Sequence, residues 1–366
     1  FLHLFHLLKK QLNRNYDRDN LDCYISRKFL NFSHLSPDQR ADHSSLATRI
    51  SNIKVDYFKK IHEALNKEIL GRFEAKKIGG YKIIRFDSTL VSIAGTLLKK
   101  IKGLQHGTNA KYRDSSSLVD IKFTIGFDGL SPTDAKIFNE QTYLSEEVAL
   151  KEVIEEYDFK ANDLAVFDRG LNKRATFDQF TNSDLIFVTR LKSFKGKVRH
   201  QLVDDVTKIE DNYPIETENL WIEKDQEVFL FGKKSKKTKH RYRLIQAKGK
   251  TNQQTYFFLT NEMELDVKDV VLIYKYRWDI EVFFKFLKQE FGFKHLLSRN
   301  QNGIEVVLYM TLITFTLIYL YYKFNNFESF KIAKMQFVNE LDFEVMKIIV
   351  TICNGDPNLL HLLKPF

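Results

Sequence analysis

The sequence has little cysteine and lacks several motifs that would assign a chemistry directly. Two cysteines, Cys23 and Cys353, occur in 366 residues. They indicate neither a disulfide framework nor a cysteine-based zinc site, so a reducing cytoplasm is the expected location. No Walker A sequence, no G-x-G-x-x-G and no H-E-x-x-H is present. Nucleotide-binding and zinc-protease functions therefore have no support.

A signal peptide is also not expected. The first eight residues are mostly apolar, but they lack a basic start and are soon followed by Lys9-Lys10. This pattern favours a helix, and since the sequence begins with Phe1 and not Met, we expect that helix to be truncated.

The overall composition predicts a folded protein with an excess of positive charge. Hydrophobic residues make up 43% and aromatic residues 14% of the chain, which argues against disorder. The formal net charge is +10 and the pI about 9.2. Such a balance favours a polyanionic partner, either nucleic acid or an anionic membrane.

One stretch near residue 280 organises the remaining interpretation. It reads Tyr274-Lys-Tyr-Arg277-Trp-Asp-Ile-Glu281-Val-Phe-Phe-Lys-Phe-Leu-Lys288, without Pro or Gly. Helical apolar spacing runs from Val267 to about residue 291. At about 100° per residue, Tyr274, Arg277, Glu281 and Lys288 fall within about 60° of one another on one helix face.

This face has two interpretations from the residues alone. It is either a solvated face with charge pairs, or a carboxylate that binds a metal while the cations neutralise neighbouring phosphates.

Two aspartates each follow an apolar strand further upstream. Tyr81-Lys-Ile-Ile-Arg-Phe predicts a strand running into Asp87-Ser-Thr, and Asp163-Leu-Ala-Val-Phe predicts one ending at Asp168-Arg-Gly. Each aspartate by itself is also typical of an ordinary turn. Open α/β sheets, however, place their sites at the carboxyl ends of strands.

The spacing Tyr-x2-Arg-x3-Glu-x6-Lys resembles the Y-R-E-K signature of DDE transposases of the bacterial insertion-sequence four family. Asp87-Ser-Thr and Asp168-Arg-Gly fit the pattern of the same family. The resemblance covers roughly residues 80–300. It implies an α/β fold with a ribonuclease-H-like mixed sheet flanked by helices, a β-rich insertion and a helical N-terminal unit.

The resemblance also implies a mechanism and a set of partners. Asp87, Asp168 and Glu281 would be the catalytic residues and would bind Mg²⁺, with Mn²⁺ as a substitute. Two such ions support DNA cleavage and then strand transfer by in-line phosphoryl displacement. Tyr274, Arg277 and Lys288 would contact DNA. The expected partners are double-stranded DNA, as terminal inverted repeats and target, and a second copy in a paired-end homodimer, with no membrane.

The order of predicted elements divides the chain into five parts. The changes in composition lie at Gly79-Gly80, at the polar and β-branched segment that starts near Ser193, and after the Glu281 helix. We expect a helical DNA-binding unit at 1–78, a first part of the catalytic core at 79–192, a β-rich insertion at 193–254, a second part of the core at 255–300 and a helical region at 301–366.

An apolar segment at Ile304–Tyr322 lies near the lower length limit of a membrane span. Three threonines interrupt it, and Glu305 and Lys323 bracket its uncharged part. We favour a helix packed against the core or a second subunit.

Two other functions fit parts of the sequence. His240-Arg-Tyr-Arg243 matches the H-x-x-R box of tyrosine recombinases, with Tyr274 or Tyr276 as a nucleophile that needs no metal. Its surroundings predict strands where that fold is helical. The other alternative is an inactive DNA-binding remnant of a transposase. Trp221 and Trp278 are each expected in a core.

Overall fold

The computed structural model describes residues 43–94, 118–194, 196–210, 212–232, 235–290, 300–352 and 354–362. Both cysteines, the N-terminal helix, the helix start expected at Ser36-Pro37-Asp38 and the loop expected near 99–117 lie outside these residues. The described residues form two compact units. Residues from Leu70 to Phe284 make up one, which we call the sheet unit, and those up to Ile69 and from Lys285 onward make up the helical unit.

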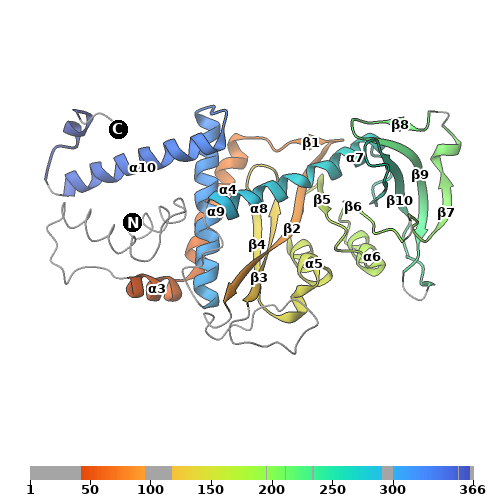
Figure 1. Ribbon diagram of the computed structural model, residues 1–366, viewed down its shortest axis with the longest axis horizontal. Helices are drawn as coiled ribbons and strands as arrows, with labels where there is room; N and C mark the ends of the chain where they lie inside the picture. The colour runs from red at the N-terminus through yellow and green to blue at the C-terminus, as the bar shows by residue number, and fades with distance from the viewer. Residues whose placement is uncertain are drawn as a thin grey trace. The chain divides into compact units, whose positions relative to one another are not determined.

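A single sheet of 11 strands forms the centre of the sheet unit (Figure 1). Nine of them follow the order β4-β3-β2-β5-β6-β11-β10-β9-β7, while β1 pairs with β2 and β8 with β9 off this path. Strands β2, β3 and β4 pair antiparallel, whereas β2, β5 and β6 run parallel. This arrangement is the ribonuclease-H-like mixed sheet that the resemblance implied. The strands of this half are β1 (Lys77–Ile78), β2 (Tyr81–Ala94), β3 (Leu118–Phe127), β4 (Pro132–Phe138), β5 (Asp163–Phe167) and β6 (Phe187–Arg190).

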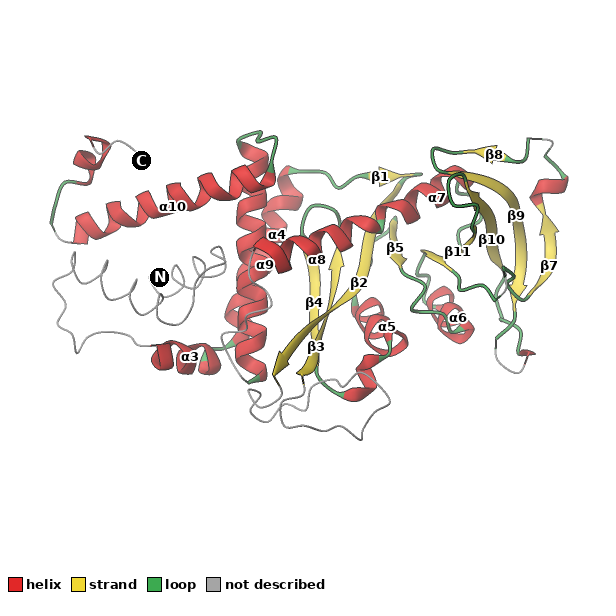
Figure 2. Ribbon diagram, viewed as in Figure 1, coloured by secondary structure: helices red, strands yellow, loops and turns green. Residues whose placement is uncertain are grey.

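Helices cover the central strands on both faces, which explains their continuous apolar sequences. Ala165 and Phe167 of β5 belong to a core with α5 (Glu146–Glu156) and α6 (Arg174–Asn182). Leu164 and Val166 belong to a second core, which includes α7 (Val267–Tyr276). Figure 2 shows α5 and α6 as separate helices beside these strands. Every residue of β5 is therefore buried.

The insertion expected at 193–254 contains strands, as its alternating polarity predicted. These are β7 (His200–Asp205), β8 (Ile215–Glu216), β9 (Leu220–Leu230) and β10 (Tyr242–Gly249). They extend the same sheet through β11 (Thr255–Thr260), which pairs with β6. The insertion is therefore continuous with the half of the sheet that contains β2, β5 and β6.

The structure corrects several expected elements. Strand β2 does not end at Asp87 but continues to Ala94, because its pairing with β3 persists after its pairing with β5 stops. Strand β4 was missed. The apolar spacing over about 51–70, with Gly71 after it, predicts a helix that stops at this glycine. Helix α4 (Val55–Arg72) instead begins at Val55 and ends one residue past Gly71. Ser145 precedes α5, but its side chain makes no cap hydrogen bond.

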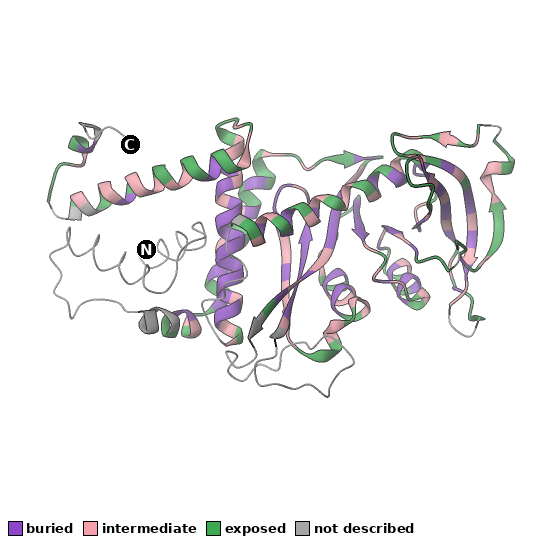
Figure 3. Cartoon of the chain, viewed as in Figure 1, coloured by how far each residue is buried: buried purple, intermediate pink, exposed green. Residues whose placement is uncertain are grey.

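The helical unit is built around α9 (Gln301–Phe324), which contains the apolar segment. It packs against α3 (His43–Asn52) and α10 (Phe330–Ile352). By length and composition α9 is able to span a membrane, yet 83% of its most apolar window is buried inside the protein. Figure 3 shows this burial along the helix. The helix is therefore packed inside the protein, against helices of its own unit, and packing against the catalytic core or a second subunit stays a prediction.

The buried His62 of α4 predicts a pH-dependent stability for the helical unit. Its ring lies edge-on to Tyr309 of α9 at 5.8 Å, and burial lowers the pKa of His62 to about 4. The unfolded chain takes up a proton below about pH 6.5, so the unfolding free energy should fall by about 1.4 kcal/mol per pH unit from there towards pH 4.

Urea unfolding followed by far-UV circular dichroism at several pH values measures this loss. His62→Gln should lack this component, because glutamine does not titrate. The expectation is wrong if wild type and variant show the same pH slope.

Candidate active site

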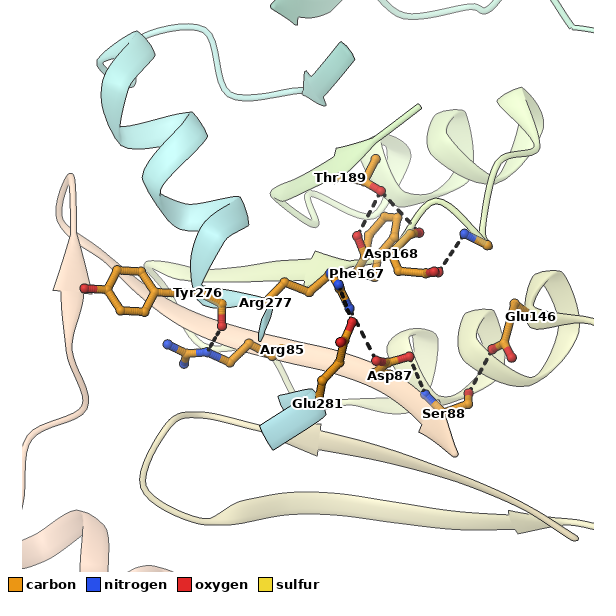
Figure 4. Close-up of polar contacts among 11 residues, drawn as sticks. Arg85, Asp87, Ser88, Glu146, Phe167, Asp168, Thr189, Tyr276, Arg277 and Glu281 are labelled. Atoms are coloured by element: carbon orange, nitrogen blue, oxygen red, sulfur yellow. Dashed lines mark hydrogen bonds and ion pairs between the residues drawn. The ribbon is translucent and has the colours of Figure 1, made fainter. Parts of the chain in front are cut away.

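The two predicted aspartates occupy matching positions on neighbouring parallel strands. Phe86 of β2 is paired with Phe167 of β5. Asp87 and Asp168 are each the next residue along, where the ladder between the two strands ends. The register of the sheet therefore brings together two carboxylates that are far apart in sequence, and Figure 4 shows both at this edge.

The turn after β5 fixes Asp168. Its carboxylate accepts a hydrogen bond from the Gly170 amide at 2.6 Å. The Thr189 hydroxyl of β6 donates to the Phe167 carbonyl at 3.0 Å. A Cβ atom at residue 170 would lie 2.6 Å from the Asp168 oxygen and 2.9 Å from Cγ of Glu146, so this close approach requires glycine.

The apolar spacing had predicted one continuous helix for the Y-R-E-K residues, but the structure contains two. They are α7 and α8 (Trp278–Glu290), divided at Arg277. The cause is the buried Arg85 of β2, whose Nε donates to the Tyr276 carbonyl at 3.0 Å. The Ile280 amide donates to the Arg277 carbonyl instead, at 3.3 Å.

Arg85 makes two further bonds that connect β2 to this junction. One guanidinium nitrogen donates to the Ile83 carbonyl at 2.8 Å and the other to the Asp279 carboxylate at 3.2 Å. The Arg85 side chain is only 3% exposed. Because Arg85 is two residues before Asp87 on the same strand, it holds the start of α8 beside the aspartates.

The guanidinium of Arg277 lies between two of the predicted catalytic carboxylates. One nitrogen is 3.4 Å from Asp87, and the other pairs with Glu281 one turn further along. Figure 4 shows this bridge with Asp168 on its far side. Asp87, Asp168 and Glu281 are therefore gathered at one place in the sheet unit.

The charge at this place is not balanced. Partial burial raises the pKa of Asp87 to about 7, the neighbouring charges of Asp168 and Glu146 also raise it, and the Ser88 amide and Arg277 lower it. Within the described residues, no three His, Cys, Asp or Glu side chains lie close enough together to hold a metal ion in this arrangement. The three predicted ligands are instead separated by Arg277, but their all-oxygen donors suit Mg²⁺.

The other predicted DNA contacts lie on the same two helices. Tyr274 is half-buried at the end of α7, with its ring 5.4 Å from Phe258. Burial raises the pKa of Tyr274, and Arg277 and Arg190 oppose this rise. Lys288 is half-buried on α8, seven residues after Glu281. The two tryptophans are not core residues, because Trp221 is 37% and Trp278 61% exposed.

Sequence reasoning missed Glu146. The side chain accepts a hydrogen bond from Ser88, next to Asp87, at 2.8 Å. From the sequence it was one of two acids in the first turn of a helix, which is a common pattern. A clearer signal was its partner Lys122, a lysine within an apolar strand.

The residues of the alternative recombinase box are used in the fold. Arg243 forms a buried ion pair with Asp225, and Tyr242 donates to Asp178 at 3.0 Å. His240 contacts Asn182 at 2.7 Å. The box therefore offers no set of phosphate-binding groups, and its surroundings are strands, as expected.

Comparison with known proteins agrees with this geometry. Residues 78–317 match the model of the transposase DDE domain family. The chain belongs to this family. It is therefore a transposase, and its function is DNA transposition, as the Y-R-E-K resemblance predicted.

The individual relatives share less than 30% of their residues with this chain. The chain is 24% identical over 294 residues to a protein of Synechocystis sp. (strain ATCC 27184 / PCC 6803 / Kazusa) named as a transposase for insertion sequence element IS4SA, covering 77% of this chain and 72% of that protein. Transposase y4zB of Sinorhizobium fredii (strain NBRC 101917 / NGR234) is 27% identical over 42% of this chain and 41% of its own length. The piggyBac transposase in a synaptic complex with hairpin DNA is a structural neighbour with a TM-score of 0.48 and 13% identity, over 99% of this chain and 74% of that one.

Arg85→Met tests whether the arginine holds the junction of this transposase. Methionine fills similar space but leaves the Tyr276 carbonyl without its donor, so we expect the sheet unit to lose about 3 kcal/mol of unfolding free energy. Both tryptophans of the chain lie in this unit, so tryptophan fluorescence in urea measures its unfolding.

Arg241→Met is the matched control. Arg241 is 57% exposed and paired with Glu227 at 2.8 Å, and such surface pairs contribute less than about 1 kcal/mol. Equal effects of the two substitutions would contradict the role given to Arg85.

Proposed function

We propose that this transposase cuts DNA at the ends of an insertion sequence and joins the freed 3′ ends to target DNA, with Asp87, Asp168 and Glu281 as its catalytic carboxylates. The observation that carries the proposal is their convergence from strand β2, the turn after β5 and helix α8 around Arg277. Converging carboxylates of this kind are the protein part of two-metal phosphoryl transfer.

The three carboxylates would hold Mg²⁺ or, as a substitute, Mn²⁺. Burial is the main cause of the raised pKa of Asp87, and the charges of Asp168 and Glu146 add to it, so a cation bound there would favour the ionised carboxylate. Bound there, the ions would stabilise the attacking and leaving oxygens of an in-line displacement. Asp87, Asp168 and Glu281 must be ionised for this role, and no covalent intermediate with the protein is needed.

Arg277 would move from its two carboxylates to a phosphate of the DNA. Its Nε atom is buried and has no hydrogen-bond partner within the described residues, so the side chain has a donor to spare. A planar guanidinium suits a phosphate, which it binds through two parallel hydrogen bonds. Lys288 would neutralise a second phosphate along α8, and Tyr274 would bind a phosphate or stack on a base.

A basic hollow beside Asp168 supplies a path for the DNA backbone. Its lining includes the three cations Arg169, Arg190 and Lys192, and its volume is about 820 Å³. The Arg190 guanidinium lies over the rings of Tyr256 and Tyr274, at 5.3 Å and 5.7 Å. The hollow thus extends from the catalytic turn towards Tyr274 and offers both charge and aromatic faces.

The partners follow from the reaction. Double-stranded DNA is both substrate and target, and the inverted repeats at the two ends are brought together by two copies of the chain. We assign DNA binding also to the N-terminal region 1–78. We place its action in the cytoplasm of a bacterial cell, at the nucleoid, because its substrate would be the DNA there.

Asp168→Asn provides the direct test of the catalytic assignment. Asparagine keeps the size and the acceptor oxygen that Gly170 uses, but it removes the charge. We expect strand cleavage of DNA carrying the gene's own flanking sequence to fall at least about 100-fold in Mg²⁺ or Mn²⁺, while DNA affinity stays within about twofold.

Asp158→Asn is the control, since Asp158 is an 84% exposed carboxylate near the opposite end of β5. It should cleave like the wild type. Cleavage by Asp168→Asn at the wild-type rate would remove Asp168 from the site, and cleavage without any metal would favour the tyrosine-recombinase mechanism. Tight, salt-sensitive binding without cleavage by the wild type would indicate an inactive remnant.

Lys288→Ala tests the contact to the backbone. Losing one phosphate contact should weaken DNA binding and reduce the slope of log K against log salt by about 0.9. Filter binding or fluorescence anisotropy at several salt concentrations measures the slope. Lys160→Ala is the control, because Lys160 precedes β5 whereas Asp168 follows it, and it should leave the slope unchanged. An unchanged slope for Lys288→Ala would show that Lys288 binds no phosphate.

A further inference from the structure

A fourth carboxylate, that of Glu146 on α5, lies against both strands that carry the aspartates. One oxygen accepts a hydrogen bond from the Ser88 hydroxyl at 2.8 Å, and the Ser88 amide donates to Asp87 at 2.8 Å. The Cβ and Cγ of Glu146 pack against Gly170, within about 3 Å of where a side chain would begin. Glu146 therefore touches the residue after Asp87 and the turn after Asp168.

The other oxygen of Glu146 is held by a buried lysine. Lys122 of β3 is 1% exposed and lies 2.9 Å from this oxygen. Its ammonium group also donates to the Leu144 carbonyl at 2.8 Å. A buried ammonium without an anion is costly, so Glu146 cannot easily turn away, and both of its oxygens are engaged.

The neighbouring Glu147 fixes the same helix turn to the segment that follows Asp168. Its carboxylate accepts from the backbone amide of Asn172 and, at 2.6 Å, from that of Lys173. Lys173 is the N-cap residue of α6 and Asn172 precedes it, so Glu147 supplies an acceptor at a helix start, where backbone donors need partners. The first turn of α5 is thereby anchored to the chain just beyond the catalytic turn.

We propose that Glu146 is a positioning residue for the catalytic carboxylates, acting on Asp87 through Ser88. Because its two oxygens are occupied by Ser88 and Lys122, it is not assigned as a metal ligand. Its function is to fix the strand position from which Asp87 projects, relative to the turn that carries Asp168. This inference rests on the proposed catalytic role of the two aspartates.

Ser88→Ala is the sharpest test, because it removes the hydrogen bond from the Ser88 hydroxyl to Glu146 but leaves the Lys122–Glu146 pair and the Ser88 amide bond to Asp87 in place. We expect Mn²⁺ alone, titrated and observed by electron paramagnetic resonance, to bind about 10–100-fold more weakly, and the cleavage rate at saturating DNA to fall by a similar factor. DNA affinity should not change. If Glu146 only neutralised Lys122, neither the Mn²⁺ affinity nor the cleavage rate would change in Ser88→Ala.

Glu146→Ala and the double variant complete a cycle. If Glu146 acts through Ser88, the double variant should be no worse than the poorer single variant, whereas independent roles would multiply. Tryptophan fluorescence verifies that the sheet unit is folded in each variant. If the unpaired buried Lys122 unfolds Glu146→Ala, the combination Lys122→Met with Glu146→Ala takes its place. Glu155→Gln, in the same helix but exposed, is the matched control.

The outcomes separate the two proposals. If Ser88→Ala binds Mn²⁺ and cleaves DNA as well as the wild type, the positioning role of Glu146 is wrong. This holds whether or not Asp168→Asn loses cleavage. No cleavage by the wild type would refute the proposed activity. The Mn²⁺ titration would still decide the role of Glu146, because binding by wild type and by Ser88→Ala is compared without DNA.

Discussion

Three hydrogen bonds from one buried arginine determine where the helix with the Y-R-E-K residues can begin. Arg85 donates hydrogen bonds to the Tyr276 carbonyl and the Asp279 carboxylate, and a third to the Ile83 carbonyl of its own strand. A helix carbonyl used in this way is lost to the i→i+4 ladder, so the helix is interrupted there. The interruption sets Arg277 and Glu281 beside Asp87, and the arrangement of the site depends on it.

Strand register provides the second fixed relation, and it needs no contact between the two aspartate side chains. The parallel ladder between β2 and β5 ends at the pair Phe86 and Phe167, and a shift by one residue would turn every side chain to the opposite face. Both phenylalanines are fully buried between the sheet and its helices, which makes such a shift very costly. Burial of the phenylalanines thus determines the relative position of the aspartates.

The sequence predicted what depends on residue type and spacing, and missed what depends on partners distant in sequence. Strand β5 and its aspartate were predicted from an apolar run with a following Asp-Arg-Gly. The continuation of β2 past Asp87 was missed, because it arises from pairing with β3 and not from β2 itself. The division at Arg277 was missed for the same reason, since its cause is a residue 192 positions upstream that periodicity cannot report.

The site carboxylates differ in how firmly their cations are held. Lys122 is an interior residue of a strand, has a second bond to a backbone carbonyl and is almost without exposure, so Glu146 has a permanent partner. Arg277 lies at a break between two helices and is 12% exposed, and among the residues that the structure describes its Nε has no hydrogen-bond partner. Asp87 and Glu281 therefore share a cation that can be exchanged. Under the proposed function, Asp87 and Glu281 would need the exchangeable pairing, because positive ions and a phosphate would have to replace their contacts to Arg277, whereas the fixed pair of Lys122 and Glu146 would support the strand behind them.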